Sequence, residues 1–111
     1  MRKAAPPREI PPPLELDCLR VLWRLGEARV RDVQTALFEN RELKYTTVMT
    51  VLGRLTRRGA VSRRKDGRSF VYAPELSEDA LRKLAVQEVV DRYFGGSKPQ
   101  LMKFMATRED E

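Results

Sequence analysis

The sequence predicts an α+β fold that is mainly α-helical, with one small β-hairpin. Apolar residues recur at helical spacing in three successive segments, residues 14–25, 30–40 and 45–58. Two short strand-like runs follow, 61–65 and 68–73, and an Asp-Gly pair separates them. Asp-Gly between two such runs is the strongest short-range signal for a hairpin. With 111 residues, the chain can form one domain with one modest core.

The first two helices have recognisable ends. Pro13 suits the entry of the first helix and Gly26 its exit, and the second helix is expected to end near Asn40. Trp23 is expected to anchor the core. Cys18 lies among leucines, so we expect a buried small side chain and not a redox-sensing thiol.

The third helix is expected from Tyr45 to Arg58, with Gly59 as a left-handed cap. Steps of about 100° per residue place apolar side chains on one face: Tyr45, Val48, Val51, Leu52 and Leu55. The opposite face collects polar and cationic residues: Thr46, Thr50, Gly53, Arg54 and Arg57, with Thr47 at its edge. Threonine is a mediocre helix former, so three of them indicate a role for their hydroxyl and methyl groups. The alternative is a solvated polar face capped by Thr46 or Thr47.

The hairpin is predicted to turn at Asp66-Gly67 with a type I′ geometry, which needs positive φ at both central residues. Alternation places Phe70 and Tyr72 on one face of the ribbon, and either face could contact the helices. Four cationic residues surround the turn: Arg63, Arg64, Lys65 and Arg68. Three helices followed by a basic hairpin is the order of a winged helix-turn-helix domain.

Positive charge is concentrated in this part of the chain. Residues 44–72 hold eight basic residues and one acidic residue, a local charge of +7. Residues 1–43 sum to +1 (eight basic, seven acidic) and residues 75–111 to −2 (six basic, eight acidic). A polyanion is the expected partner, because neutralising phosphates releases condensed counterions. The pattern is typical of a protein that binds double-stranded DNA.

Residue usage argues against other classes of function. The chain has no histidine and one cysteine, and it lacks the glycine-rich nucleotide-binding motifs, so we expect neither an enzyme nor a metal or cofactor site. No apolar run approaches the roughly 20 residues that span a bilayer. The basic N-terminus is not followed by an apolar region, so it does not read as a signal peptide, and we expect a cytoplasmic protein without membrane insertion.

The predicted winged domain covers residues 14–74, and a segment of different composition lies on each side of it. Residues 1–13 hold five of the seven prolines and predict a flexible arm. Residues 75–111 predict helices from Ser77 to Phe94 and after Gly95-Gly96, too apolar for an appendage and too short to bury themselves. We therefore expect a homodimer, although these helices could instead fold back on their own domain. The candidate dimer contacts are Leu81, Leu84, Val89, Val90, Tyr93, Phe94, Leu101, Met102, Phe104 and Met105.

Four segments together resemble the penicillinase-repressor family of the BlaI/MecI type. They are LDCLRVLW (16–23), VRDVQTAL (30–37), YTTVMTVLGRLTRRG (45–59) and KDGRSFVYAP (65–74). The resemblance covers residues 14 to about 105, and its last two motifs in this order are quite specific. It implies a dimeric winged-helix repressor of β-lactamase or related resistance operons, whose third helix reads the major groove while the hairpin contacts the DNA backbone.

The expected mechanism is passive repression at a pseudo-palindromic operator. Thr46, Thr50 and Arg54 are expected to read bases, with Arg54 on a guanine. Arg57 is a further candidate for DNA binding. The other candidates would mainly contact phosphates: Tyr45, Thr47, Arg63, Arg64, Lys65 and Arg68. Two alternatives stay open, a winged-helix regulator with its own small-molecule inducer and a winged-helix protein-interaction module.

The resemblance also implies a partner, a membrane-bound zinc-protease sensor that inactivates the repressor. The family's asparagine–phenylalanine cleavage site would fall at Lys103–Phe104, where lysine replaces asparagine. The sequence ends at Glu111, before the last dimerisation helix of longer members, which predicts a dimer that is weaker or lacks its closing helix.

Overall fold

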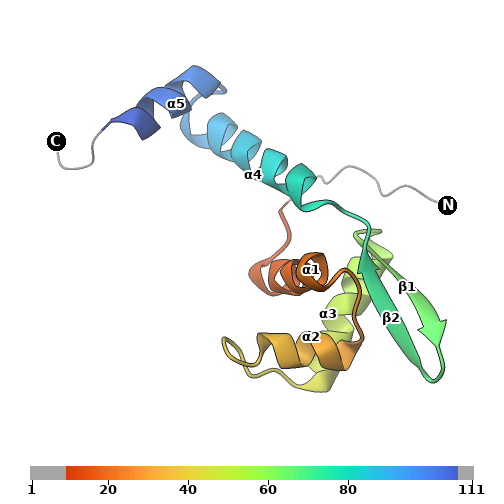
Figure 1. Ribbon diagram of the computed structural model, residues 1–111. Coiled ribbons are helices and arrows are strands. Elements are labelled where there is room, and N and C mark those ends of the chain that lie inside the picture. Colours follow the sequence, from red (N-terminus) through yellow and green to blue (C-terminus); the bar gives the residue numbers. More distant parts are fainter. Residues whose placement is uncertain (1–9, 108–111) are drawn as a thin grey trace.

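The computed structural model describes residues 10–107 and has the predicted α+β class (Figure 1). Most of the predicted N-terminal arm, residues 1–9, lies outside the described residues. The elements in chain order are α1 (Pro13–Leu25), α2 (Val30–Leu37), α3 (Tyr45–Arg57), β1 (Val61–Asp66), β2 (Ser69–Pro74), α4 (Glu78–Tyr93) and α5 (Lys98–Ala106). The three helices and the hairpin therefore follow the predicted winged helix-turn-helix order.

Helix ends lie close to the predicted positions. Pro13 occupies the first turn of α1, where its missing N–H costs no hydrogen bond. The chain leaves α3 through Gly59, whose φ of 81° is a conformation that glycine adopts without steric cost. α2 ends at Leu37, and a turn continues through Asn40.

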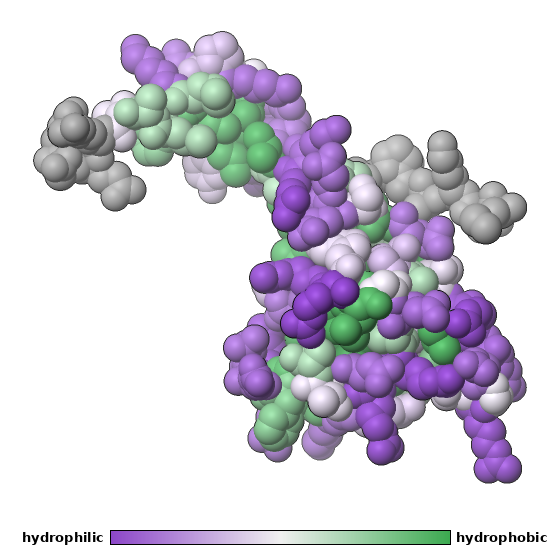
Figure 2. Space-filling view, viewed as in Figure 1, coloured by the Kyte–Doolittle hydropathy of each residue, from purple (hydrophilic) through white to green (hydrophobic). Residues whose placement is uncertain are grey.

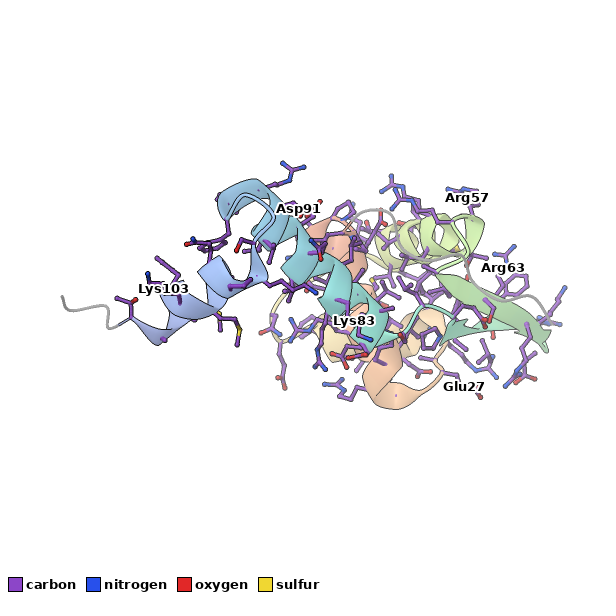
Figure 3. All side chains as sticks on the ribbon, turned by 90° about the horizontal axis from the view of Figure 1, so that it is seen from above. Glu27, Arg57, Arg63, Lys83, Asp91 and Lys103 are labelled. Atoms are coloured by element: carbon purple, nitrogen blue, oxygen red, sulfur yellow. The ribbon has the colours of Figure 1, made fainter. Side chains whose placement is uncertain are left out.

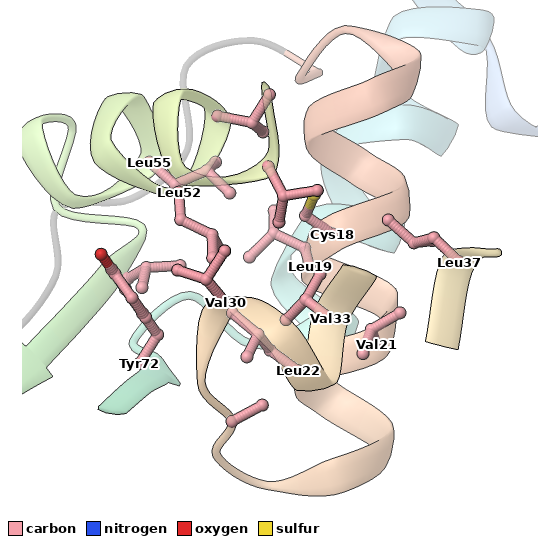
Figure 4. Packing of buried hydrophobic residues seen from close by; sticks show 14 of the residues in the cluster. Cys18, Leu19, Val21, Leu22, Val30, Val33, Leu37, Leu52, Leu55 and Tyr72 are labelled. Atoms are coloured by element: carbon pink, nitrogen blue, oxygen red, sulfur yellow. The ribbon is translucent and has the colours of Figure 1, made fainter. Parts of the chain in front are cut away.

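The core lies between α1, α2, α3 and the base of the hairpin (Figure 4). Cys18, Leu22 and Leu52 are fully buried there, which confirms the expectation for the cysteine. Burial raises the pKa of the Cys18 thiol to about 12, with smaller contributions in the same direction from the nearby carboxylates of Asp17 and Glu15. Tyr45 was predicted on the apolar face of α3 but is 41% exposed, because the first turn of the helix extends beyond the core.

The hairpin turns one residue later than predicted. Asp66 pairs with Ser69, so the two-residue loop is Gly67-Arg68. Positive φ occurs at Gly67 (68°) and not at Arg68, which excludes type I′ and fits a type II′ turn with glycine first. A side-chain contact accompanies this register, since the Arg29 guanidinium donates hydrogen bonds to Asp66 and to the Ser69 hydroxyl, the closing pair of the ladder.

A third extended segment joins the hairpin without any sequence signal. The N–H of Ala28 donates to the Tyr72 carbonyl at 2.9 Å, and the N–H of Tyr72 donates to the Ala28 carbonyl at 2.8 Å. Val71 and Tyr72 are both buried, so both faces of β2 are covered at the base of the hairpin. The connection between α1 and α2 is thus joined to β2 by an isolated antiparallel β-bridge.

The segment between β2 and α4 is tied to the winged domain. The N–H groups of Glu75 and Leu76 both donate to the Ala60 carbonyl, at 2.9 and 3.1 Å. The Trp23 indole N–H donates to the Leu76 carbonyl at 2.8 Å. Leu81, one turn into α4, is buried against the same core. The direction in which α4 leaves the domain is therefore fixed by several contacts.

Beyond that turn, α4 and α5 project away from the winged domain (Figure 1). The radius of gyration is 17.0 Å, compared with about 13 Å for a compact chain of this length. α5 follows α4 at an angle and leads farther from the winged domain (Figure 1). Near the joint between the two helices, Val90 is fully buried and the Phe94 and Phe104 rings lie 5.6 Å apart. The two helices pack on each other, and only the start of α4 folds onto the winged domain.

Candidate nucleic-acid interface

The outer face of α3 carries the residues that were expected to read bases. Thr46, Thr50 and Arg54 are exposed there, as is Arg57 one turn later, while Thr47 and Gly53 are half-buried at its edges. Four apolar side chains fix the helix from its other side: Val48, Val51, Leu52 and Leu55. The turn before α3 is held by Gln34, whose side-chain amide donates to the Leu43 carbonyl at 2.9 Å. The face is therefore presented on a rigid helix.

The hydrogen-bonding state of these side chains limits what they can do. The Thr50 hydroxyl donates to the Thr46 carbonyl at 2.9 Å, so its oxygen remains free only as an acceptor. An acceptor suits the amino group of adenine or cytosine.

The N-terminus of α3 has no side-chain cap from Lys44, so N–H groups of the first turn remain available to an anion.

The hairpin places further cations at the same end of the molecule. Figure 3 shows Arg57 of α3 and Arg63 of β1 close together there, with Lys103 at the opposite end. The Arg63 guanidinium lies 4.1 Å from the centre of the Phe70 ring, a cation–π contact that orients it without neutralising it. Lys65 and Arg68 are exposed, and neither has a carboxylate partner among residues 10–107.

Two arginines of the basic segment are partly neutralised by distant acids. Arg58 forms an ion pair with the buried Glu15 at 2.5 Å, and Arg64 pairs with Glu27 at 2.9 Å. Neither acid belongs to residues 44–72, so subtracting these two charges from +7 leaves +5. Arg58 serves α1 packing, and Arg64, a predicted phosphate contact, is already bound to a carboxylate. No sequence pattern pairs residues this far apart.

The predicted dimer contacts divide into three groups. Exposed side chains are Val89, Tyr93, Met102, Phe104 and Met105. Leu84, Phe94 and Leu101 are half-buried, and Leu81 and Val90 are buried within the same chain. Val86, which is 48% exposed, belongs with the first group but was not predicted. Figure 2 shows a hydrophobic area on the surface of α4 and α5, the two helices that carry these exposed side chains.

Within the described part of the chain, no cluster of three or more His, Cys, Asp or Glu side chains could hold a metal ion. Over the same residues, no helix is long and apolar enough to cross a bilayer.

Comparisons with known proteins agree with the sequence motifs. The penicillinase repressor of Bacillus licheniformis is 28% identical over 83 residues, covering 75% of this chain and 65% of that protein. The transcriptional regulator BlaI of Mycobacterium tuberculosis is 44% identical over 69 residues, 61% of this chain and 50% of the relative. The chain thus spans less than two thirds of the length of these curated relatives.

A solved structure is similar over the winged domain. It is the Bacillus licheniformis BlaI monomeric form in complex with the blaP half-operator, with a TM-score of 0.54 and 31% identity, covering 65% of this chain and 90% of that one. The family model described as penicillinase repressor matches residues 12–111, nearly the whole sequence. The chain therefore belongs to the penicillinase repressor family.

Proposed function

We propose that the chain is a sequence-specific DNA-binding transcriptional repressor that acts as a homodimer on a pseudo-palindromic operator, controlling a β-lactam-resistance or related stress operon. The winged domain, residues 14–74, binds DNA, and residues 75–111 dimerise. One observation carries the proposal: α3, with its exposed Thr and Arg face, lies at the same end of the molecule as the basic hairpin, with Arg57 and Arg63 both at that end. Family membership and the solved complex of a BlaI relative with a half-operator support it.

In this proposal α3 lies in the major groove. Arg54 donates two hydrogen bonds to a guanine, and the hydroxyls of Thr46 and Thr50 contact neighbouring base edges. The cations of the hairpin and the open N-terminus of α3 hold phosphates and set the register. Twofold protein symmetry would then match two half-sites about one helical turn, or a small multiple, apart.

The test begins by selecting, from DNA upstream of the protein's own gene, the fragments that the purified protein protects from nuclease. Arg54→Ala should weaken binding to that operator by about 1–3 kcal/mol and weaken binding to a random duplex much less. Arg92→Ala is the matched control, because Arg92 is exposed on α4 and, within the described part of the chain, its one carboxylate partner is Glu88 at 4.0 Å. Equal losses of Arg54→Ala on both duplexes would remove its base-reading role.

The membrane zinc-protease sensor belongs to the proposal as the partner that inactivates the repressor. Lys103 and Phe104 are both exposed but lie within α5, so a protease would have to open that helix before it could cleave between them. Incubating the chain with the candidate sensor and mapping fragments by mass spectrometry tests this step.

The alternative function, a winged-helix protein-interaction module, predicts that the protein has no affinity for any duplex at low salt.

A further inference from the structure

The connection between α1 and α2 brings an acidic side chain against the basic hairpin. Ala28 is bound to Tyr72 by two backbone hydrogen bonds, so residues 27–29 run beside β2. Glu27 immediately precedes this anchored residue. Its Oε1 accepts a hydrogen bond from Nη2 of Arg64 on β1 at 2.9 Å. The backbone bridge thus positions the Glu27 carboxylate at a predicted phosphate-binding arginine.

Within residues 10–107, no other acid has an equally close contact with Arg64. Asp66 Oδ2 lies 3.9 Å from Nη1 of Arg64, but the same oxygen accepts a bond from Arg29 at 2.7 Å. Arg29 also donates to the Ser69 hydroxyl, so Asp66 is committed to the turn of the hairpin. Among the described residues, Glu27 is therefore the closest partner of the Arg64 guanidinium.

We propose that Glu27 acts as an internal competitor for phosphate: it occupies the Arg64 guanidinium and so lowers the affinity of the hairpin for polyanions. A carboxylate and a phosphate offer the same guanidinium two acceptor oxygens and negative charge, so only one can hold it fully. The pair is about half exposed, with 53% of the Glu27 and 58% of the Arg64 side chain accessible, so DNA can displace the carboxylate. The Glu27–Arg64 pair weakens contacts of the hairpin with DNA phosphates, and this effect does not depend on the base sequence.

The inference rests on the proposed function, because DNA is the polyanion that it concerns. It specifies which residue sets the strength of sequence-independent binding. Weaker phosphate contacts by the hairpin leave a larger share of the operator affinity to α3, which raises discrimination against the genome's many non-specific sites.

The experiment compares Glu27→Gln with the wild type in two assays, elution from immobilised heparin by a salt gradient and fluorescence anisotropy with a random 20-base-pair duplex. Because exposed ion pairs are weak, Glu27→Gln should bind the duplex roughly two- to tenfold more tightly. Its affinity should also fall more steeply with salt, by about one phosphate contact in the slope. Heparin elution should shift to higher salt.

Two further variants isolate the pair. Glu88→Gln removes the same charge from a glutamate on α4, whose carboxylate lies 4.0 Å from Arg92, and should leave both assays unchanged. Arg64→Ala should abolish the gain, so that Glu27→Gln/Arg64→Ala and Arg64→Ala bind equally. The three substituted side chains, Glu27, Arg64 and Glu88, are at least partly exposed. A melting curve for each variant verifies that it is folded.

Several results would overturn the inference: unchanged or weaker binding by Glu27→Gln, an equal gain with Glu88→Gln, or a gain that persists without Arg64. Weaker binding would mean that Glu27 orients Arg64 toward phosphate. If heparin elution shifts while no variant binds any duplex, the inference about Glu27 stands and the proposed DNA function fails. If duplex binding is strong and insensitive to Glu27→Gln, the function stands and the inference fails.

Discussion

Trp23 joins α1 to the segment that leads into α4, and Trp23→Phe should lower the free energy of unfolding by about 2–4 kcal/mol. The indole N–H donates to the Leu76 carbonyl at 2.8 Å, and Leu76 is only 8% exposed, so water can hardly replace the donor. An acceptor left without a partner there costs about 1–3 kcal/mol. The smaller phenyl ring also gives up apolar contact with the core worth about 1 kcal/mol.

Urea unfolding followed by far-UV circular dichroism measures this loss, because the variant has no tryptophan for fluorescence. At this chain length the melting temperature should fall by roughly 10 °C. Tyr45→Phe is the control, since Tyr45 is exposed and should change stability by less than about 0.5 kcal/mol. A similarly small loss for Trp23→Phe would refute the reasoning, because the hydrogen bond would then not hold the segment before α4.

Three other perturbations test separate parts of the structure. Gly67→Ala should cost about 1–2 kcal/mol in urea unfolding, because Gly67 has a φ of 68° while nothing crowds an added Cβ; no loss would contradict the turn geometry. The Cys18 thiol, with its pKa raised by burial to about 12, should resist alkylation at pH 8 until urea unfolds the chain. Stability should also decline above pH 9, where the unfolded thiol ionises and the folded one does not, and a flat profile there would contradict the shift. Tyr93→Asp with Met102→Asp, at side chains 77% and 66% exposed, should give folded monomers in sedimentation velocity, whereas a persisting dimer would place the interface elsewhere.

The helices could be predicted because their signals are local. Apolar spacing and the residues at the ends, such as Pro13 and Gly59, act within one or two turns of the chain. The hairpin was predicted for the same reason, but its exact turn was not. Asp-Gly marks a reversal without fixing the register, and the observed register is accompanied by a contact from Arg29, which is 37 residues before Asp66.

The candidate site shows the same limit. Periodicity correctly placed Thr46, Thr50 and Arg54 on the exposed face of α3, since one helix determines that arrangement. It could not show which cations are neutralised, because Glu15 is 43 residues from its partner Arg58. Composition gives every arginine the same weight, whereas tertiary packing decides which of them remain free of a carboxylate partner.

If the chain dimerises on an operator as proposed, the contacts at residues 75 and 76 have a consequence for the spacing of the half-sites. α4 is a continuous helix of 16 residues, about 24 Å long, and it starts from a joint that hydrogen bonds and the buried Leu81 make stiff. In a dimer, two such joints would hold the winged domains at a set separation and rotation. One base pair inserted between half-sites would turn the second by roughly 35°, a rotation that a stiff joint resists. In the proposed dimer, binding would therefore depend on the spacing of the half-sites as well as on their base sequence.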